Sequence, residues 1–261
     1  MKVIILLIAG GGVIHESDEL AQRRTWANNP PPEIEVIWLR GRLGSEFVYE
    51  NNTLFVPCAN NFSSILEKTI LGIQWVESNR SFDLLIRSNT STYFNLTNLN
   101  HGHSRYKLDS VGGTFETSRK TIYSYPKGYR YLNGSGLYLG RAASSALIRM
   151  KYDEFQGIPD DIAIHSYLDS AGFKFYEIPR NNLDLHHVFV PRTQVRVKSW
   201  SKAELTIARM DLVHEYFQGN SFLERLSRWV MVELNEIYNS KLSLKSINNY
   251  LIRQLNNKRN I

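Results

Sequence analysis

The sequence has a single cysteine, Cys58, and therefore cannot form an internal disulfide bond. This excludes a small secreted scaffold held by disulfides and fits a reducing compartment. Internal repeats and low-complexity segments are also absent. With 43% hydrophobic and 21% charged residues over 261 positions, the composition excludes both a disordered tail and a polytopic membrane protein. We therefore expect a folded domain with a sizeable core.

Acidic residues are outnumbered, because 31 Lys and Arg face 25 Asp and Glu, for a formal net charge of +6. An excess of positive charge favours an anionic partner, such as nucleotide phosphates, nucleic acid or acidic lipid. The charge alone does not choose among these. A nucleic-acid binder would depend on this charge only, since no recognition motif accompanies it, and we expect no specific nucleic-acid partner.

A short apolar run opens the chain and ends at Gly10-Gly11-Gly12. It is too short for a membrane span, and glycines replace the small-residue cleavage site of a signal peptide. The run predicts a buried parallel strand whose carboxyl end opens onto a ligand crevice, which places Ala9 and Gly10 at that crevice. We expect the protein to be cytoplasmic and not secreted.

Strands and helices alternate along the first hundred residues, which predicts an α/β sheet. A Thr-, Tyr- and Gly-rich stretch over 106–139 adds antiparallel strands, so the sheet is expected to be mixed. In helix 62–76, apolar residues from Phe62 to Val76 recur every three or four positions. Helices are expected over 17–28, 62–76, 142–151 and 160–171, and strands over 34–39, 53–57, 82–87, 173–178 and 194–198.

The chain from residue 203 onward is expected to be mostly helical, which predicts one domain over 1–200 and a helical extension over 201–261. Within it, residues 219–261 are rich in Lys and Arg and carry a Leu/Ile stripe. Two interpretations stay open: the basic helices lie peripherally on an anionic membrane surface, or they pack on the sheet with a solvated basic face. We favour the second.

Several short motifs, in this order, resemble those of the β-1,3-glycosyltransferase superfamily, which includes fringe proteins and galactosyltransferases. Each motif is weak alone, but their order and spacing over about residues 3–200 make the match more specific. The resemblance implies a GT-A fold, a nucleotide-sugar donor, and donor contacts by Arg24 and Lys68. The motifs are Arg23-Arg24-Thr25-Trp26, Lys68-Thr69, Gln74-Trp75, Tyr125-Pro126, Asn133-Gly134-Ser135-Gly136 and Ile158-Pro159-Asp160-Asp161-Ile162-Ala163-Ile164.

The sequence departs from that family at the position of its Asp-rich motif, whose carboxylates hold Mn²⁺ or Mg²⁺ against the donor diphosphate. Asn89, Thr90 and Ser91 stand there instead. Hard divalent cations prefer charged oxygen ligands, so we expect no metal cofactor. Asn89 and Ser91 remain candidates for contacting the donor.

Fixed cations could then oppose the charge of the departing diphosphate. One charge pair about 4 Å apart is worth about 4 kcal/mol at an effective dielectric constant of about 20. Arg196 and Lys198 are the first candidates, because their spacing by two puts them on one face of a strand. The alternative is the exposed face of an amphipathic strand, and with the family resemblance we favour phosphate binding. Arg87 and Arg192 are further candidates for opposing the diphosphate charge. His187 either donates a hydrogen bond to the diphosphate or has a structural role.

Asp160 and Asp161 begin a predicted helix after Pro159. The resemblance implies that Asp161 is the base that deprotonates the acceptor hydroxyl and that Asp160 orients it or binds acceptor. Two neighbouring carboxylates also raise one pKa towards a useful value. The alternative is a simple helix cap.

A turn at Gly134, Ser135 and Gly136, beside Tyr131, is the candidate acceptor contact, since glycines let backbone approach a ligand and aromatic rings stack on sugars. A plain turn and sheet-packing tyrosines are the alternatives. Together these residues predict an inverting, metal-independent transferase of the hexosyltransferase type that moves a sugar from a nucleotide donor, expected to be UDP-linked, to a glycan or glycolipid. The rival is an inactive domain of the same fold that binds nucleotide or sugar without turnover.

Overall fold

Eight strands of the computed structural model form one mixed central sheet within the residues that the structure describes, which are 1–10, 13–96, 99, 108–118, 121–122, 124–178, 181–184 and 207–211. The strand order is β11-β7-β10-β5-β1-β2-β4-β3. Strands β1, β2, β4 and β5 run parallel, and β10 runs antiparallel between β5 and β7. The strands are β1 (Val3–Ile8), β2 (Ile34–Gly41), β3 (Val48–Glu50), β4 (Thr53–Val56), β5 (Leu84–Asn89), β7 (Val111–Gly113), β10 (Leu137–Gly140) and β11 (Phe175–Glu177).

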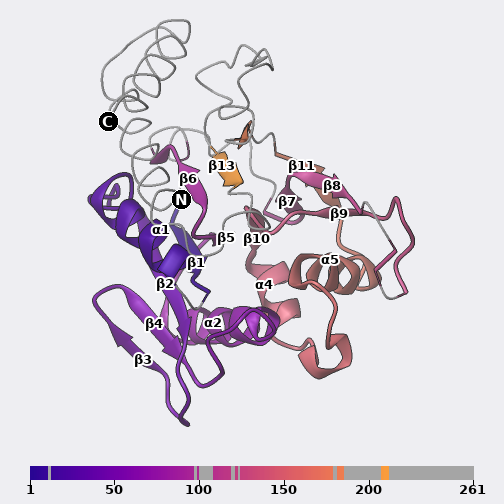
Figure 1. Cartoon of the computed structure of the whole chain (residues 1–261), viewed down its shortest axis with the longest axis horizontal. Helices are drawn as coiled ribbons and strands as arrows, with labels where there is room; N and C mark the ends of the chain where they lie inside the picture. The colour runs from indigo at the N-terminus through magenta and orange to yellow at the C-terminus, as the bar shows by residue number, and fades with distance from the viewer. Residues whose placement is uncertain are drawn as a thin grey trace, which may run out of the picture.

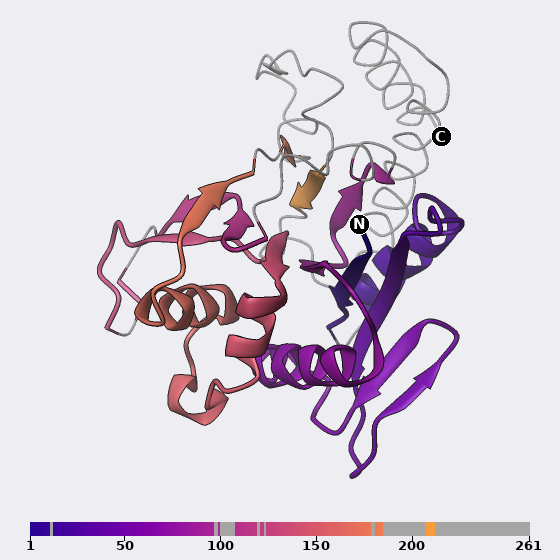
Figure 2. The ribbon, with the colours of Figure 1, turned by 180° about the vertical axis from the view of Figure 1, so that it is seen from behind.

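Helices cover both faces of this sheet (Figures 1 and 2). Helices α2 (Ile65–Asn79), α4 (Arg141–Leu147) and α5 (Asp160–Ser170) contact one another over one face. Helix α1 (Val13–Arg24) covers the other face. The mixed α/β sheet flanked by helices that the sequence predicts is therefore confirmed.

Strand β1 is buried on both faces, which explains its unbroken Val/Ile/Leu run. Successive strand residues point to opposite faces, so its side chains divide between two cores. Ile4, Leu6 and Ile8 pack with apolar side chains of α2, α4 and α5. Val3, Ile5 and Leu7 pack with Ala21 of α1 and with Trp26.

Helix α2 begins at Ile65, three residues later than the apolar spacing predicts. The Asn61 side-chain oxygen accepts hydrogen bonds from the Ser64 backbone N–H at 3.0 Å and from the Ser64 hydroxyl at 2.9 Å, which holds a turn before the helix. Phe62 therefore lies outside the helix and is 81% exposed, so its assignment to the apolar helical face was wrong.

Other predicted elements also differ from the structure: α4 ends at Leu147 although 142–151 was predicted, and β5 spans Leu84–Asn89 although 82–87 was predicted. Helix α1 begins at Val13 and ends at Arg24, whereas 17–28 was predicted. Residues 207–211, within the stretch predicted to be helical, form strand β13 (Ile207–Asp211) instead. Tertiary pairing decides this, because β13 pairs with both β6 (Thr92–Phe94) and β12 (Asn181–Asp184).

Small elements complete the described chain. Strands β8 (Phe115–Thr117) and β9 (Arg130–Leu132) form an antiparallel pair, and a 3₁₀ helix, η2 (Tyr152–Phe155), precedes α5. The predicted strand over 194–198 and the rest of the C-terminal extension lie outside the described residues. No helix in the described parts of the chain is long and apolar enough to cross a membrane.

Several chain segments meet at one edge of the sheet. Parallel strands β1 and β5 end there side by side, with Ile8 opposite Asn89. Because β10 is antiparallel to β5, it begins at the same edge, with Leu137 opposite Arg87. Side chains from the end of β5, the segment before β10 and the start of α5 are thereby brought together.

Candidate functional site

Arg87, near the end of β5, is the buried centre of the site, with only 1% of its surface exposed. Its guanidinium forms an ion pair with the Asp160 carboxylate at the start of α5. It also donates to the Gly134 carbonyl and, at 2.8 Å, to the side-chain oxygen of Asn89. One side chain thus joins β5, the segment before β10 and the first turn of α5.

Asp161 lies next to this ion pair and accepts two backbone hydrogen bonds, from Ile162 N–H at 2.9 Å and from Gly134 N–H at 3.3 Å. Burial, and then the negative charge of Asp160, raise the pKa of Asp161 to about 7, although Arg87 and the two backbone donors act in the opposite direction. A carboxyl group with this pKa is close to ideal for taking a proton near neutral pH.

Lys68 of α2 is fully buried at the end of β1. Its ammonium donates to the Ala9 carbonyl at 2.9 Å and to the side-chain oxygen of Asn60 at 2.7 Å. Burial lowers the pKa of Lys68 to about 8, and the nearby guanidinium groups of Arg40 and Arg87 lower it as well. Both hydrogen-bond acceptors are neutral, so they leave the positive charge of Lys68 in place.

The segment before β10 is fixed to β5 and β6 by side-chain hydroxyls. Ser88 and Thr92 both donate to the Ser135 carbonyl, at 2.5 and 3.1 Å. A Cβ atom at Gly134 would clash with Nη1 of Arg87, so a larger residue here would displace the guanidinium. Ser135 and Gly136 are buried like Gly134, so the turn serves to hold Arg87 rather than to present side chains.

The Asn89-Thr90-Ser91 position does not fit a divalent cation. The Asn89 side-chain oxygen already accepts a hydrogen bond from the Arg87 guanidinium, and Thr90 Oγ1 lies 3.1 Å from Nδ1 of His15. A cation here would have neutral ligands and a neighbouring positive charge, which is the opposite of what Mg²⁺ or Mn²⁺ requires. Within the described residues, no three His, Cys, Asp or Glu side chains are grouped as a metal site.

The sequence-predicted site residues fall into three groups. The structure brings together Arg87, Asn89, Asp160, Asp161 and the 134–136 turn, with Ala9, Gly10 and Lys68 at the adjoining end of β1. Arg24 is exposed at the far end of α1, about 18 Å along the helix from its start. Ser91 lies on the β5–β6 turn, and Tyr131 lies in β9, opposite Glu116. His187, Arg192, Arg196 and Lys198 lie outside the described residues.

Sequence reasoning missed a hollow beside Asp160, formed by Phe62 and the segment that leads into α5. The Asn60-Asn61 pair before Phe62 is a turn signal, and it could have separated this ring from the helical face. Sequence reasoning also missed Asn60 as the partner of Lys68, since no local pattern connects a turn residue to a lysine eight positions away.

Known proteins of similar structure share little sequence with this chain. No protein-family model matches the chain, and no curated protein matches its sequence. Among solved structures, a glycosyltransferase involved in the glycosylation of the major capsid of PBCV-1 is similar, with a TM-score of 0.46 and 11% identity over 88% of this chain and 98% of that chain. The galactosyltransferase LgtC, in complex with donor and acceptor sugar analogs, is similar with a TM-score of 0.41 and 11% identity, over 93% of this chain and 100% of that chain. These values assign no chemistry to individual residues of this chain.

Proposed function

We propose that this protein is an inverting glycosyltransferase that moves a sugar from a nucleotide-sugar donor to a hydroxyl group of a glycan or glycolipid. The observation that carries the proposal is the carboxyl pair at the start of α5. Arg87 holds Asp160, while Asp161 keeps a pKa of about 7 beside it. The motifs that resemble β-1,3-glycosyltransferases supply the same pair with the same division of roles.

The proposed reaction is a single displacement. Asp161 accepts the proton of the acceptor hydroxyl while that oxygen forms a bond to the anomeric carbon of the donor sugar. The bond from the anomeric carbon to the phosphate oxygen breaks, and the nucleoside diphosphate leaves with the electron pair. Attack opposite the leaving group inverts the anomeric configuration, and the carboxylate contributes typically 10²–10⁴-fold as a general base.

Positive charge is needed where the diphosphate leaves. Lys68 lies at the end of β1, where ligands bind in open α/β sheets, and among the described residues its ammonium bonds neutral acceptors that leave its charge in place. It supplies part of the field that favours the departing anion. Arg196 and Lys198 are proposed to supply the rest by direct contact, as their spacing on a predicted strand suggests, with His187 as a further hydrogen-bond donor.

Metal independence is part of the proposal. It is supported by the chemistry of the Asn89 position, where a guanidinium stands in place of the charge that a divalent cation would bring. A UDP-linked donor and a peripheral membrane contact of the basic C-terminal residues are further parts of the proposal, as is cytoplasmic location.

Turnover of a panel of nucleotide sugars in the presence of EDTA tests this function, with released nucleoside diphosphate as the measured product. The wild-type protein should release it, and Asp161→Asn should lower the rate by about 10²–10⁴-fold. Asp169→Asn is the matched control, since this exposed aspartate lies at the other end of the same helix. Binding of UDP without turnover of any donor would instead establish the inactive nucleotide-binding alternative.

A further inference from the structure

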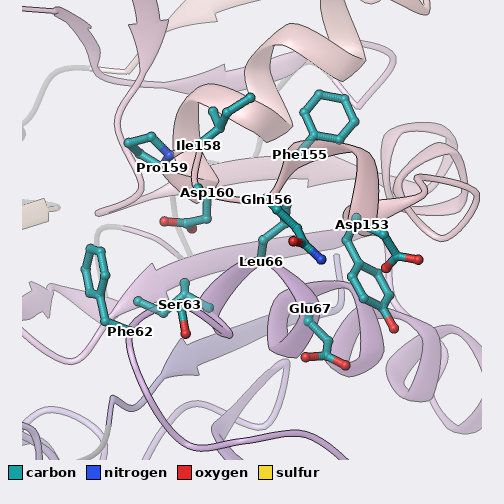
Figure 3. A pocket seen from close by; sticks show the side chains of 13 residues that line it. Phe62, Ser63, Leu66, Glu67, Asp153, Phe155, Gln156, Ile158, Pro159 and Asp160 are labelled. Carbon is teal, nitrogen blue, oxygen red and sulfur yellow. The ribbon is translucent and has the colours of Figure 1, made fainter. Parts of the chain in front are cut away.

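A hollow of about 450 Å³ opens between the start of α2 and the segment that leads into α5 (Figure 3). Phe62, Ser63 and Glu67 stand on one side, and Ile158, Pro159 and Asp160 stand on the other. Its volume lies within the range of about 300–1,000 Å³ that is typical of small-molecule sites. The lining residues are Phe62, Ser63, Ile65, Leu66, Glu67, Tyr152, Asp153, Phe155, Gln156, Gly157, Ile158, Pro159 and Asp160.

The hollow combines apolar surfaces with hydrogen-bonding groups. Phe62 leaves 81% of its surface in water at the rim, although an aromatic side chain gains by burial. Leu66, Phe155 and Ile158 add further apolar surface, while Ser63 and Gln156 add neutral donors and acceptors. A sugar has the complementary surface, because its C–H faces pack on aromatic rings and its hydroxyls bond polar groups.

Charge distinguishes this hollow from the edge where the donor diphosphate is proposed to bind. Three of its 13 lining residues are carboxylates, namely Glu67, Asp153 and Asp160, and none is Lys, Arg or His. Asp160 is paired with Arg87, so the negative charge of the lining comes from Glu67 and Asp153. A carboxylate-lined surface repels a diphosphate or an acidic sugar. Neutral hydroxyls can donate hydrogen bonds to the same carboxylates, so the lining selects an uncharged polyol.

The hollow also borders the first turn of α5, which carries the proposed base. Asp160 lines it, and Asp161, the proposed base, follows directly in the first turn of α5. From the adjacency, the exposed ring and the acidic lining, we propose that this hollow binds the acceptor as a neutral saccharide, with Phe62 as its stacking platform. This inference rests on the proposed glycosyltransferase function and assigns the acceptor class and residues that the motifs did not indicate.

Saturation-transfer NMR on the full chain tests the proposal, with methyl glycosides of neutral hexoses and N-acetylhexosamines as probes and methyl glucuronide as their anionic counterpart. At least one neutral glycoside should receive saturation, and the glucuronide should not. Binding of the glucuronide alone, or of none of these probes, would overturn the proposal.

Variants locate the bound sugar. Phe62→Ala should weaken glycoside binding about tenfold, the loss expected for one aromatic contact, and Phe62→Trp should restore it. Phe47→Ala is the matched control, because Phe47 is also exposed but lies outside the hollow, and this variant should bind like wild type. Asp153→Asn should make glucuronide saturation detectable where wild type shows none, because it removes one repelling charge.

The result separates the two proposals. If Phe62→Ala leaves glycoside binding intact while Asp161→Asn abolishes donor turnover, the hollow is not the acceptor site but the transferase function stands. If Phe62→Ala weakens binding of UDP, the hollow belongs to the donor and this inference is wrong. If no donor is turned over by wild type while Phe62 governs glycoside binding, the saccharide site stands and the transferase function falls.

Discussion

Arg87 and Asp160, 73 residues apart in the sequence, form an ion pair in which the guanidinium is 1% and the carboxylate 16% exposed. The pair joins the end of a central strand to the first turn of α5. The pair lies next to Asp161, so we expect its loss to lower the free energy of unfolding and to change the pKa of the proposed catalytic base. Because its guanidinium is buried, we expect Arg87 to act as a positioning residue that holds Asp160 and lowers the pKa of Asp161 by its charge.

Replacing Arg87 tests the stability of this pair. Arg87→Met leaves the Asp160 carboxylate largely buried without its partner, and the free energy of unfolding should fall by about 3–5 kcal/mol. Urea denaturation measures this loss. Arg141→Met is the control. Arg141 is 53% exposed and its distance to Glu77 is a long 3.5 Å, so the loss of this surface pair should cost less than about 1 kcal/mol. Similar losses in the two variants would contradict the structural role of Arg87.

The pH dependence of turnover should report Asp161. Only the ionised carboxylate accepts a proton, so kcat/KM should rise with pH and level off above about 7, where the raised pKa of Asp161 lies. Asp160→Asn should shift this midpoint to lower pH, because Asp160 raises the pKa of Asp161. Arg87→Met should shift it to higher pH. A midpoint that neither substitution moves would belong to another group.

The same shift predicts an effect on unfolding that is independent of turnover. The pKa of Asp161 is higher in the folded protein than its ordinary value of 3.8, so the folded state binds more protons between these values. The contribution of Asp161 to stability is therefore full below about pH 4 and is lost as the pH rises through 7. Urea denaturation measures this effect: the free energy of unfolding of Asp161→Asn should fall less than that of wild type as the pH rises from about 4 to above 7.

Replacing Gly134 tests its close contact with Arg87. An alanine Cβ would clash with Nη1, so the guanidinium must move away from residue 134, and Gly134→Ala should cost about 1–3 kcal/mol. In the Arg87→Met background the same substitution should cost much less, because the clashing atom is gone. A double-mutant cycle from urea denaturation measures this coupling, and equal costs in both backgrounds would contradict the contact.

Lys68 should make the free energy of unfolding increase with pH between about 8 and 10.5. Burial lowers its pKa from 10.5 to about 8, so between these values the unfolded chain binds more protons than the folded protein. This contribution to stability is complete above pH 10.5 and is lost as the pH falls through 8. The difference between wild type and Lys68→Met should show it, whereas Lys151→Met, whose side chain is 79% exposed, should follow wild type.

The sequence located most elements but not all of their ends. The apolar run of β1 and the spacing of α2 are local patterns that burial enforces, so they predict the elements well. The start of α2 was missed because the hydrogen bonds that Ser64 donates to the Asn61 side chain hold a turn that places Phe62 before the helix. Strand β13 was missed because its partner β6 lies more than a hundred residues earlier, where no local pattern reaches.

The candidate site shows the same division. The sequence by itself determined that Asp160 and Asp161 begin a helix and that neutral residues occupy 89–91, since both depend on neighbouring positions. Only the tertiary structure decided that Arg87 bonds Asp160, that Lys68 reaches Ala9, and that Phe62 faces the segment before α5. Those contacts depend on the order of the strands in the sheet and on which strand and helix ends lie at the same edge. Burial of the whole core sets that arrangement, and no short stretch of sequence does.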